Sequence, residues 1–338
     1  MESTAIINIK PLGFPWETLD PFIFCVHHRD EFPIGNEKMG PAVSLAGRNI
    51  GQDFSGKDKW NMYHGQTMPG FPYHPHRGFE TVTVVKEGVV DHTDSLGAAG
   101  RFSTGDVQWM TAGKGVLHSE IFPLLHTDKP NPMELFQIWL NLPKRSKFVQ
   151  PHFKMLWNEN IPVLTETDTN GRAVEVNVIA GYLKGKHAPK PTPDSWAAEA
   201  NNHVSILTIK LNADATWTLP KTEAGVNRML YFYKGGAIKI AATDISVYHS
   251  VQLKSDVDVT LEAGNEPCYL LLLQGKPMNE PVVQYGPFVM NTEEEIREAF
   301  AEYQKTQFGG WPWPNHEQAH ARDRGRFALH ADGREEKM

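Results

Sequence analysis

The stretch from Phe71 to Phe122 decides the fold of this chain. It opens with HPHRGFE at residues 74–80 and closes with GKGVLHSE at residues 113–120. Both segments otherwise resemble β-strands, and together they hold three histidines and two carboxylates. A polar side chain that faces the core needs a binding partner. The positions of these side chains on the strands therefore indicate which partner they share.

The two segments each place a pair of polar side chains at strand spacing. Side chains two residues apart on a strand share a face. His74 and His76 therefore point the same way, as do His118 and Glu120. If the two strands face one another across a barrel, these four side chains can converge on one cation. Neutral imidazoles and a carboxylate suit Fe(II), Mn(II), Ni(II), Cu(II) or Zn(II), and are too rich in nitrogen for Ca(II) or Mg(II).

The strand that follows His74 and His76 predicts which face of the sheet these two histidines occupy. After Glu80, the even positions are Val82 and Val84 and the odd ones are threonines, so the even face is predicted to be buried and to carry His74 and His76. A lone histidine on such a face is better explained as a hydrogen-bonded core residue. Two pairs at strand spacing favour a metal site instead.

These residues carry a resemblance to a known family. The run HPHRGFETVTVV at residues 74–85, with DHTDSLGAAGRFSTGDVQWMTAGKGVLHSE at residues 91–120, resembles the signature of the pirin family within the cupin superfamily. The likeness is looser over most of the chain and returns strongly at residues 279–292. Thr111 departs from the second cupin motif, because many cupins have proline there.

The resemblance implies an all-β bicupin fold, with two antiparallel β-barrel (jelly-roll) domains and a short C-terminal helix. The expected boundaries are 1–160 for a metal-binding cupin domain, 161–290 for a cupin domain without metal, and 291–338 for a helix and tail. The second domain lacks a histidine pair at i and i+2, and His249 stands alone in it.

The resemblance also implies a cofactor: one iron, expected as Fe(II), in the N-terminal barrel. The residues that match the family's ligands are His74, His76, His118 and Glu120. Glu80 matches a metal ligand of many other cupins but not of pirins, so we expect it to support the site or the fold. From residue types alone, Mn, Ni, Cu and Zn stay as alternatives.

The function that the resemblance implies is that of a metal-dependent dioxygenase, an oxidoreductase that cleaves a flavonol such as quercetin with dioxygen. Glu120 would be the catalytic base that accepts the flavonol hydroxyl proton, by analogy with flavonol-cleaving cupins. The alternative is a non-enzymatic iron- or redox-sensing regulator that binds a transcription factor or a metabolic enzyme. An enzyme with another oxidisable substrate is a third candidate.

The composition of the chain indicates which partners and which cellular location to expect. The net charge of −7, from 33 basic and 40 acidic residues, argues against direct nucleic acid binding through a general basic surface. Cys25 and Cys268 are far apart and flanked by apolar residues, which predicts buried reduced thiols. The first ten residues lack the features of a signal peptide, and no segment is apolar for long enough to span a bilayer, so we expect a cytoplasmic protein without membrane contact.

The C-terminal residues contain the clearest helix signal. Thr292 and Glu295 form a capping box, and Ile296, Phe300 and Tyr303 make one apolar stripe, so a helix is predicted over 293–305 with that stripe on the core. The polar residues that follow contain His316, His320 and His330. We expect a solvated tail anchored by two tryptophans there rather than a second metal site.

Overall fold

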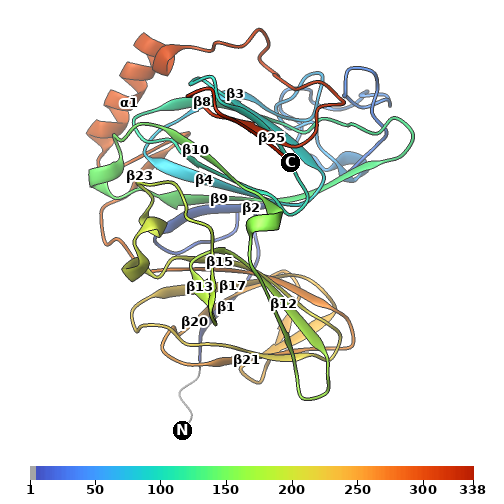
Figure 1. The fold of residues 1–338 in the computed structure, drawn as a ribbon, viewed down its shortest axis with the longest axis vertical. Helices are drawn as coiled ribbons and strands as arrows, with labels where there is room; N and C mark the ends of the chain where they lie inside the picture. The colour runs from blue at the N-terminus through green and yellow to red at the C-terminus, as the bar shows by residue number, and fades with distance from the viewer. Residues whose placement is uncertain (1–4) are drawn as a thin grey trace. The chain divides into compact units, whose positions relative to one another are not determined.

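The computed structural model describes residues 5–338, which are folded mostly as β-strands. The chain divides into two compact units, each built from two separate parts of the sequence (Figure 1). The apolar unit, as we call it, takes the chain up to Val26 and then Glu159–Asn279. The histidine unit takes His27–Asn158 and Glu280–Met338.

The histidine unit contains two large sheets and one hairpin. The five-stranded sheet has the order β10 (His152–Leu156), β7 (Val107–Thr111), β4 (Phe79–Glu87), β9 (Asn131–Asn141), β2 (Phe22–Phe32), and β2 belongs to this unit from His27 onward. The six-stranded sheet has the order β26 (Glu335–Lys337), β25 (Phe327–Leu329), β6 (Ala99–Ser103), β5 (Val89–Asp94), β8 (Val116–Ile121), β3 (Gly70–His76). The hairpin pairs β23 (Val283–Tyr285) with β24 (Phe288–Met290).

The apolar unit also contains two large sheets and one hairpin. The seven-stranded sheet has the order β1 (Ile6–Pro11), β20 (His249–Leu253), β17 (Asn227–Lys234), β22 (Cys268–Gly275), β15 (Ser205–Leu211), β12 (Ala173–Ala180), β11 (Val163–Thr167). The four-stranded sheet has the order β16 (Thr216–Leu219), β21 (Val259–Ala263), β18 (Ala237–Ile240), β19 (Thr243–Ser246). The hairpin pairs β13 (Tyr182–Leu183) with β14 (Lys186–His187).

Six short 3₁₀ turns complete the described secondary structure. They are η1 (Lys57–Lys59), η2 (Lys144–Ser146), η3 (Asn158–Asn160), η4 (Trp196–Ala198), η5 (Ala200–Asn202) and η6 (Gln307–Gly309). Within residues 5–338 the two large sheets of each unit are separate, so the predicted two-cupin architecture is confirmed with open sheets in place of closed barrels.

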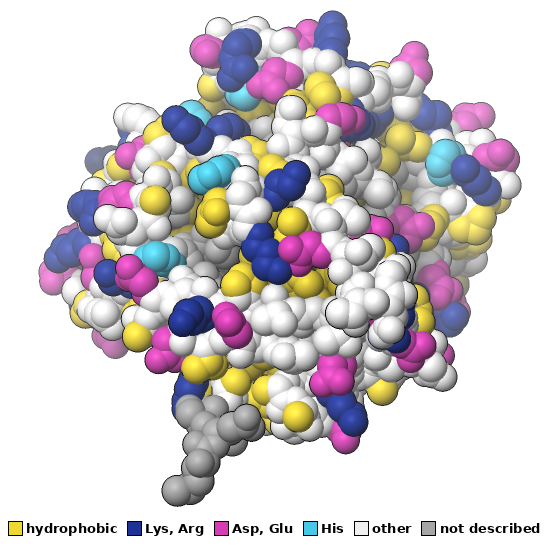
Figure 2. Space-filling model, turned by 60° about the horizontal axis from the view of Figure 1, so that its bottom comes forward, with side chains coloured by type: hydrophobic (Ala, Val, Ile, Leu, Met, Phe, Trp, Pro, Cys, Tyr) yellow, Lys and Arg dark blue, Asp and Glu magenta, His cyan; other side chains and the backbone are white. Residues whose placement is uncertain are grey.

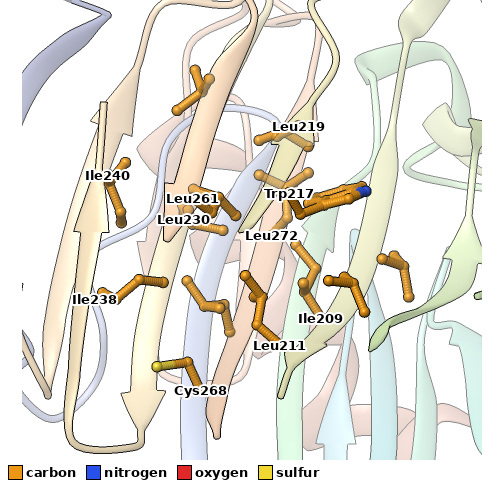
Figure 3. Packing of buried hydrophobic residues seen from close by; sticks show 14 of the residues in the cluster. Ile209, Leu211, Trp217, Leu219, Leu230, Ile238, Ile240, Leu261, Cys268 and Leu272 are labelled. Carbon is orange, nitrogen blue, oxygen red and sulfur yellow. The ribbon is translucent and has the colours of Figure 1, made fainter. Parts of the chain in front are cut away.

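The core of the apolar unit is formed by side chains from both of its large sheets. Ile209 and Leu211 of β15 share one buried cluster with Ile238 and Ile240 of β18 (Figure 3). Each alternates with a residue on the other face of its strand, as the period of two requires. Burying one such side chain contributes about 1.5–3 kcal/mol. Cys268 belongs to this cluster and, like Cys25, is buried and free, as predicted.

The first strand belongs to the apolar unit, whereas the expected boundaries place it in the first domain. Strand β1 pairs antiparallel with β20, and Lys10 lies opposite Ser250. The expected ranges 1–160, 161–290 and 291–338 stay a prediction, and the compact units join residues up to 26 with 159–279 and residues 27–158 with 280–338. Strands far apart in the sequence pair with each other, so a compact unit need not be one continuous range of residues.

The predicted C-terminal helix is confirmed as α1 (Glu293–Thr306). The Thr292 hydroxyl accepts from the Glu295 backbone N–H, and the Glu295 carboxylate accepts from the Thr292 N–H, so the capping box is complete. Ile296 is buried, and Phe300 and Tyr303 pack against the same small cluster as Phe288. The apolar stripe is therefore a docking face, as expected.

The residues after α1 are folded onto the six-stranded sheet and are not simply a solvated tail. The two tryptophans are anchors as predicted: Trp311 stacks on Tyr73, and Trp313 Nε1 donates to the Asp94 carbonyl at 2.8 Å. Strand β25 pairs with β6, where Ala328 lies opposite Gly100, and β26 pairs with β25. His320 is only 7% exposed and its Nε2 lies 3.2 Å from the His92 carbonyl. The prediction of solvation missed this docking because the backbone of this segment hydrogen-bonds to a sheet edge, which polar side chains do not reveal.

The charges on the visible surface are mixed. Figure 2 shows basic and acidic side chains interspersed over the displayed face, with hydrophobic side chains in small groups between them. Among the described residues, none of the helices combines the length and the apolar character needed to cross a bilayer.

Candidate metal centre

Two neighbouring strands of the histidine unit carry the predicted ligand pairs. Strands β3 and β8 are antiparallel partners in the six-stranded sheet, and His74 lies directly opposite His118. The two ligand pairs are therefore brought together by direct strand pairing and not across a barrel. A register shift between Phe71 and His74 precedes the site. Because adjacent residues on paired strands have their Cβ atoms about 4.5–5.5 Å apart, the pairing itself brings the imidazoles together.

The three histidines form one compact group. One ring nitrogen from each of His74, His76 and His118 lies within 4.8 Å of those of the other two. The Nε2 atoms of His74 and His76 are 3.1 Å apart. The ring centroids of His118 lie 4.5 Å from His74 and 4.8 Å from His76. Nitrogen ligands about 2.0–2.2 Å from one ion lie at most about 4.4 Å apart. The 3.1 Å separation of the His74 and His76 nitrogens fits a shared divalent cation, and the three-histidine group is close to the size that one ion requires.

Burial keeps these histidines neutral. Desolvation is the main cause that lowers the pKa of His74 to about 4, and it holds the pKa values of His76 and His118 well below the ordinary value. A neutral imidazole offers a lone pair to a cation. Among residues 5–338, neither ring nitrogen of His118 finds a hydrogen-bond partner. Buried polar atoms of this kind are costly unless something binds them, and a metal ion would.

Glu120 lies beside the three histidines. Its Oε2 is 3.9 Å from Nε2 of His118. Thr83 Oγ1 donates to Oε1 at 2.9 Å, and Gln137 Nε2 donates to Oε2 at 2.8 Å. Burial raises the pKa of Glu120, against the opposing effects of His92 and of these two donors. A carboxylate oxygen has more than one lone pair, so both hydrogen bonds leave room for a further ligand contact.

The threonine face of β4 lies toward this site, contrary to the expected orientation. Thr83 reaches Glu120, and both Thr81 and Thr83 are about as buried as the valines between them. The alternation failed because β4 is a central strand covered on both faces. Glu80, on the other face, accepts from Thr111 Oγ1 at 2.6 Å and is fully buried. That contact fits a supporting role for Glu80.

His92 is a site residue that the sequence reasoning missed. It lies opposite Glu120 in the pairing of β5 with β8, and its ring is 5.6 Å from that of His118. It is fully buried and stacks on Phe153 with centroids 5.1 Å apart. Neither ring nitrogen has a hydrogen-bond partner among the described residues, and Nε2 is 3.5 Å from Oδ2 of Asp94. The spacing of His92 and Asp94 at i and i+2 is the signal that could have found it.

Aromatic rings surround the first histidine pair. His76 lies 5.0 Å from Phe79 and 5.4 Å from Trp139, measured between ring centroids. Tyr73, the residue before His74, stacks on Trp311 with centroids 5.0 Å apart. These contacts restrict the rotation of the strand that carries the pair, and they exclude water from one side of it.

The three histidines of the C-terminal segment lie in separate places. The carbonyl of His316 accepts from the Tyr73 N–H, and Nε2 of His330 lies 2.7 Å from Glu336. His320 contacts the backbone of β5. Among the described residues, the compact three-histidine group is the one that could hold a metal ion.

Comparison with known proteins fits this geometry. The fold and the buried histidine group define a two-domain cupin. The sequence profile of the family "Pirin" matches residues 16–140, and that of the "Pirin C-terminal cupin domain" matches residues 206–309. The chain belongs to the pirin family.

Individual relatives from plants and bacteria are similar to most of this chain. A pirin-like protein of Solanum lycopersicum is 36% identical, over 70% of this chain and 75% of its own. A Vibrio cholerae protein provisionally named quercetin 2,3-dioxygenase is 35% identical, over 71% of this chain and 80% of its own. A crystal structure named quercetin 2,3-dioxygenase from Acinetobacter baumannii has a TM-score of 0.71 and 27% identity, and covers 90% of this chain and 98% of its own.

Proposed function

We propose that this protein is a metal-dependent dioxygenase that cleaves a flavonol such as quercetin. The observation that carries the proposal is the group of three buried, neutral histidines with donor atoms within 4.8 Å of one another. The names of the Vibrio cholerae and Acinetobacter baumannii relatives support the choice of reaction.

The proposed ligands are His74, His76, His118 and Glu120, with Fe(II) as the bound ion. Three imidazoles and one carboxylate leave up to two positions of an octahedral ion open for substrate or dioxygen. Iron is proposed from the family, and Mn, Ni, Cu and Zn are the alternatives that metal reconstitution would compare. The two free buried cysteines support a cytoplasmic setting as part of this proposal.

In the proposed reaction, the protein's own residues accept and hold the proton of the flavonol hydroxyl. When bound, the ion would supply the Lewis-acid and redox chemistry that a flavonol and dioxygen require. Glu120 would accept the proton of the flavonol hydroxyl, and the burial that raises its pKa favours holding it. Coordination acts in the opposite direction, because a nearby cation lowers the pKa of a carboxylate. Thr83 and Gln137 hold the carboxylate in one orientation.

The test is oxygen-dependent loss of flavonol absorbance by the full chain reconstituted anaerobically with Fe(II). Free Fe(II) at the same concentration is measured beside it, because iron alone oxidises flavonols. We expect turnover well above the free-iron rate. Rates equal to free iron, with bound metal confirmed, would reject the dioxygenase and favour the iron-sensing regulator.

The Glu120→Gln variant tests the base. We expect turnover to fall about 10²- to 10⁴-fold, the usual contribution of a general base, while bound metal is still measurable. Glu175→Gln, on strand β12 of the apolar unit, is the matched control and should keep parental turnover. Parental turnover in Glu120→Gln would show that Glu120 is not the base.

The Gln137→Ala variant tests the orientation of Glu120. Gln137 donates to Oε2, and loss of a residue that orients a ligand costs about 10- to 100-fold in metal affinity. We expect a loss of that size in competition with a chromophoric chelator. Gln252→Ala, on strand β20, is the control. An unchanged affinity in Gln137→Ala would mean that the hydrogen bond from Gln137 does not position Glu120 for metal binding.

A further inference from the structure

The apolar unit contains a cavity that the proposed function does not use. Its volume is about 900 Å³, in the range of small-molecule sites. Three side chains on its wall lie in one row across neighbouring strands: Ser205 of β15 is opposite Gln274 of β22, which is opposite Arg228 of β17. This polar row lies at one end of strands whose next inward residues are leucines, among them Leu207 and Leu272.

Arg228 is a buried cation whose hydrogen bonds are incomplete. It is 2% exposed, and burial lowers its pKa to about 10, so it stays charged at neutral pH. Its Nε donates to Oε1 of Gln274 at 2.8 Å, and one Nη donates to the carbonyl of Pro220 at 2.9 Å. Nη1 has no acceptor among residues 5–338. Asp258 acts on it only through longer-range attraction.

A buried guanidinium without a carboxylate partner is costly to keep. Removing a charge from water is repaid only when an opposite charge or a full set of hydrogen bonds replaces the water. Gln274 and Pro220 supply neutral acceptors, which satisfy part of that requirement. An anion that enters the cavity would supply the rest.

The walls of the cavity are apolar and its charged groups are mostly basic. Leu219 and Leu272 line it and also belong to the core cluster, as Figure 3 shows. Further apolar lining comes from other leucines, alanines and prolines. The charged residues that line it are Lys184, Lys190, Lys221, Arg228 and one acid, Glu199. The charge of Lys184 is balanced by Glu166, whose Oε2 lies 2.7 Å from Nζ, so the buried cation at the polar row is Arg228.

We propose that this cavity binds an amphipathic monocarboxylate, an organic acid with an apolar body. The carboxylate would bind Arg228 beside Gln274 and Ser205, and the apolar body would pack on the leucines. Nη1 of Arg228, which has no acceptor among residues 5–338, can donate a charge-assisted hydrogen bond to a carboxylate oxygen. The site is independent of the histidine cluster and of the proposed dioxygenase reaction.

Binding to the full chain tests the proposal, with octanoate and 2-naphthoate as aliphatic and aromatic probes and octanol as the uncharged match. Isothermal titration should show saturable binding of at least one acid and about 10- to 100-fold weaker binding of octanol, the usual effect of a charge-assisted hydrogen bond. Arg228→Gln should weaken the acid by a similar factor. Arg297→Gln, which changes an exposed arginine of α1, should not.

A second variant, Ala188→Phe, tests the proposal even if Arg228→Gln fails to fold. It leaves Arg228 unchanged and adds a larger side chain to the cavity lining, so it should abolish acid binding while circular dichroism stays parental. Three results would overturn the proposal: no binding of either acid to the parent, binding of octanol as tight as octanoate, or parental acid affinity in folded Arg228→Gln or Ala188→Phe. Flavonol turnover is measured separately, so failure here is distinguishable from failure of the dioxygenase.

Discussion

His118→Ala should lose Fe(II) and reduce flavonol turnover to the rate of free iron. His118 is fully buried at the centre of the candidate site, directly opposite His74 and two residues from Glu120. Loss of a residue that merely orients a ligand costs about 10- to 100-fold in metal affinity. Loss of a proposed ligand should therefore cost more than about 100-fold by the same scale. Bound iron is measured by elemental analysis after desalting.

The matched control is His249→Ala. His249 is a half-buried strand histidine of the apolar unit, with Nδ1 3.1 Å from the Val247 carbonyl. It should keep parental iron content and turnover. Circular dichroism of His118→Ala should stay parental, because the alanine removes a side chain that has no hydrogen-bond partner among residues 5–338. A folded His118→Ala that retains one iron per chain would reject the proposed ligand set.

The candidate site could be predicted where it depends on local spacing. His74 and His76 share a strand face because they are two residues apart, and the structure brings both to His118. The helix α1 could be predicted for the same reason, since its capping box involves residues three apart. In both cases the deciding contact is short in sequence, so the periodicity of the backbone is enough.

Other features depended on pairing between distant strands. Whether β3 lies beside β8 or opposite it is decided by the hydrogen-bond ladder and not by the sequence of either strand. His92 enters the site because β5 is the other neighbour of β8. The face of β4 that reaches Glu120 could not be chosen by alternation, because both faces are covered. Long-range pairing also placed β1 in the apolar unit.

The C-terminal segment illustrates how a polar sequence can still be firmly docked. It follows the last residue matched by the family profiles, residue 309. Backbone and side chains both attach it to the rest of the histidine unit: the Arg101 guanidinium donates to the carbonyls of His320, Ala321 and Arg324, and the Arg326 guanidinium donates to the Asp106 carboxylate. Every residue has a backbone carbonyl group, so the amino-acid composition of the segment does not reveal which carbonyls accept hydrogen bonds from Arg101.

Asp91→Ala should lower the free energy of unfolding of the histidine unit by about 3–5 kcal/mol, the cost of leaving one partner of a buried ion pair alone. Arg101 donates to both oxygens of Asp91, at 2.6 and 2.7 Å, and both side chains are almost fully buried. The His320 N–H also donates to Asp91, at 2.8 Å. Loss of Asp91 therefore leaves a buried cation and weakens the attachment of the C-terminal segment.

Guanidinium denaturation measures this effect, with limited proteolysis to report release of the C-terminal segment. The matched control is Glu31→Ala in the same unit. Its partner is Lys59 at 3.2 Å, and the two side chains are 55% and 75% exposed. An exposed pair contributes about 0–1 kcal/mol, so Glu31→Ala should stay near the parent. If Asp91→Ala and Glu31→Ala lowered stability equally, the buried pair would not be what holds the C-terminal segment, and its strand pairing through β25 would have to do so.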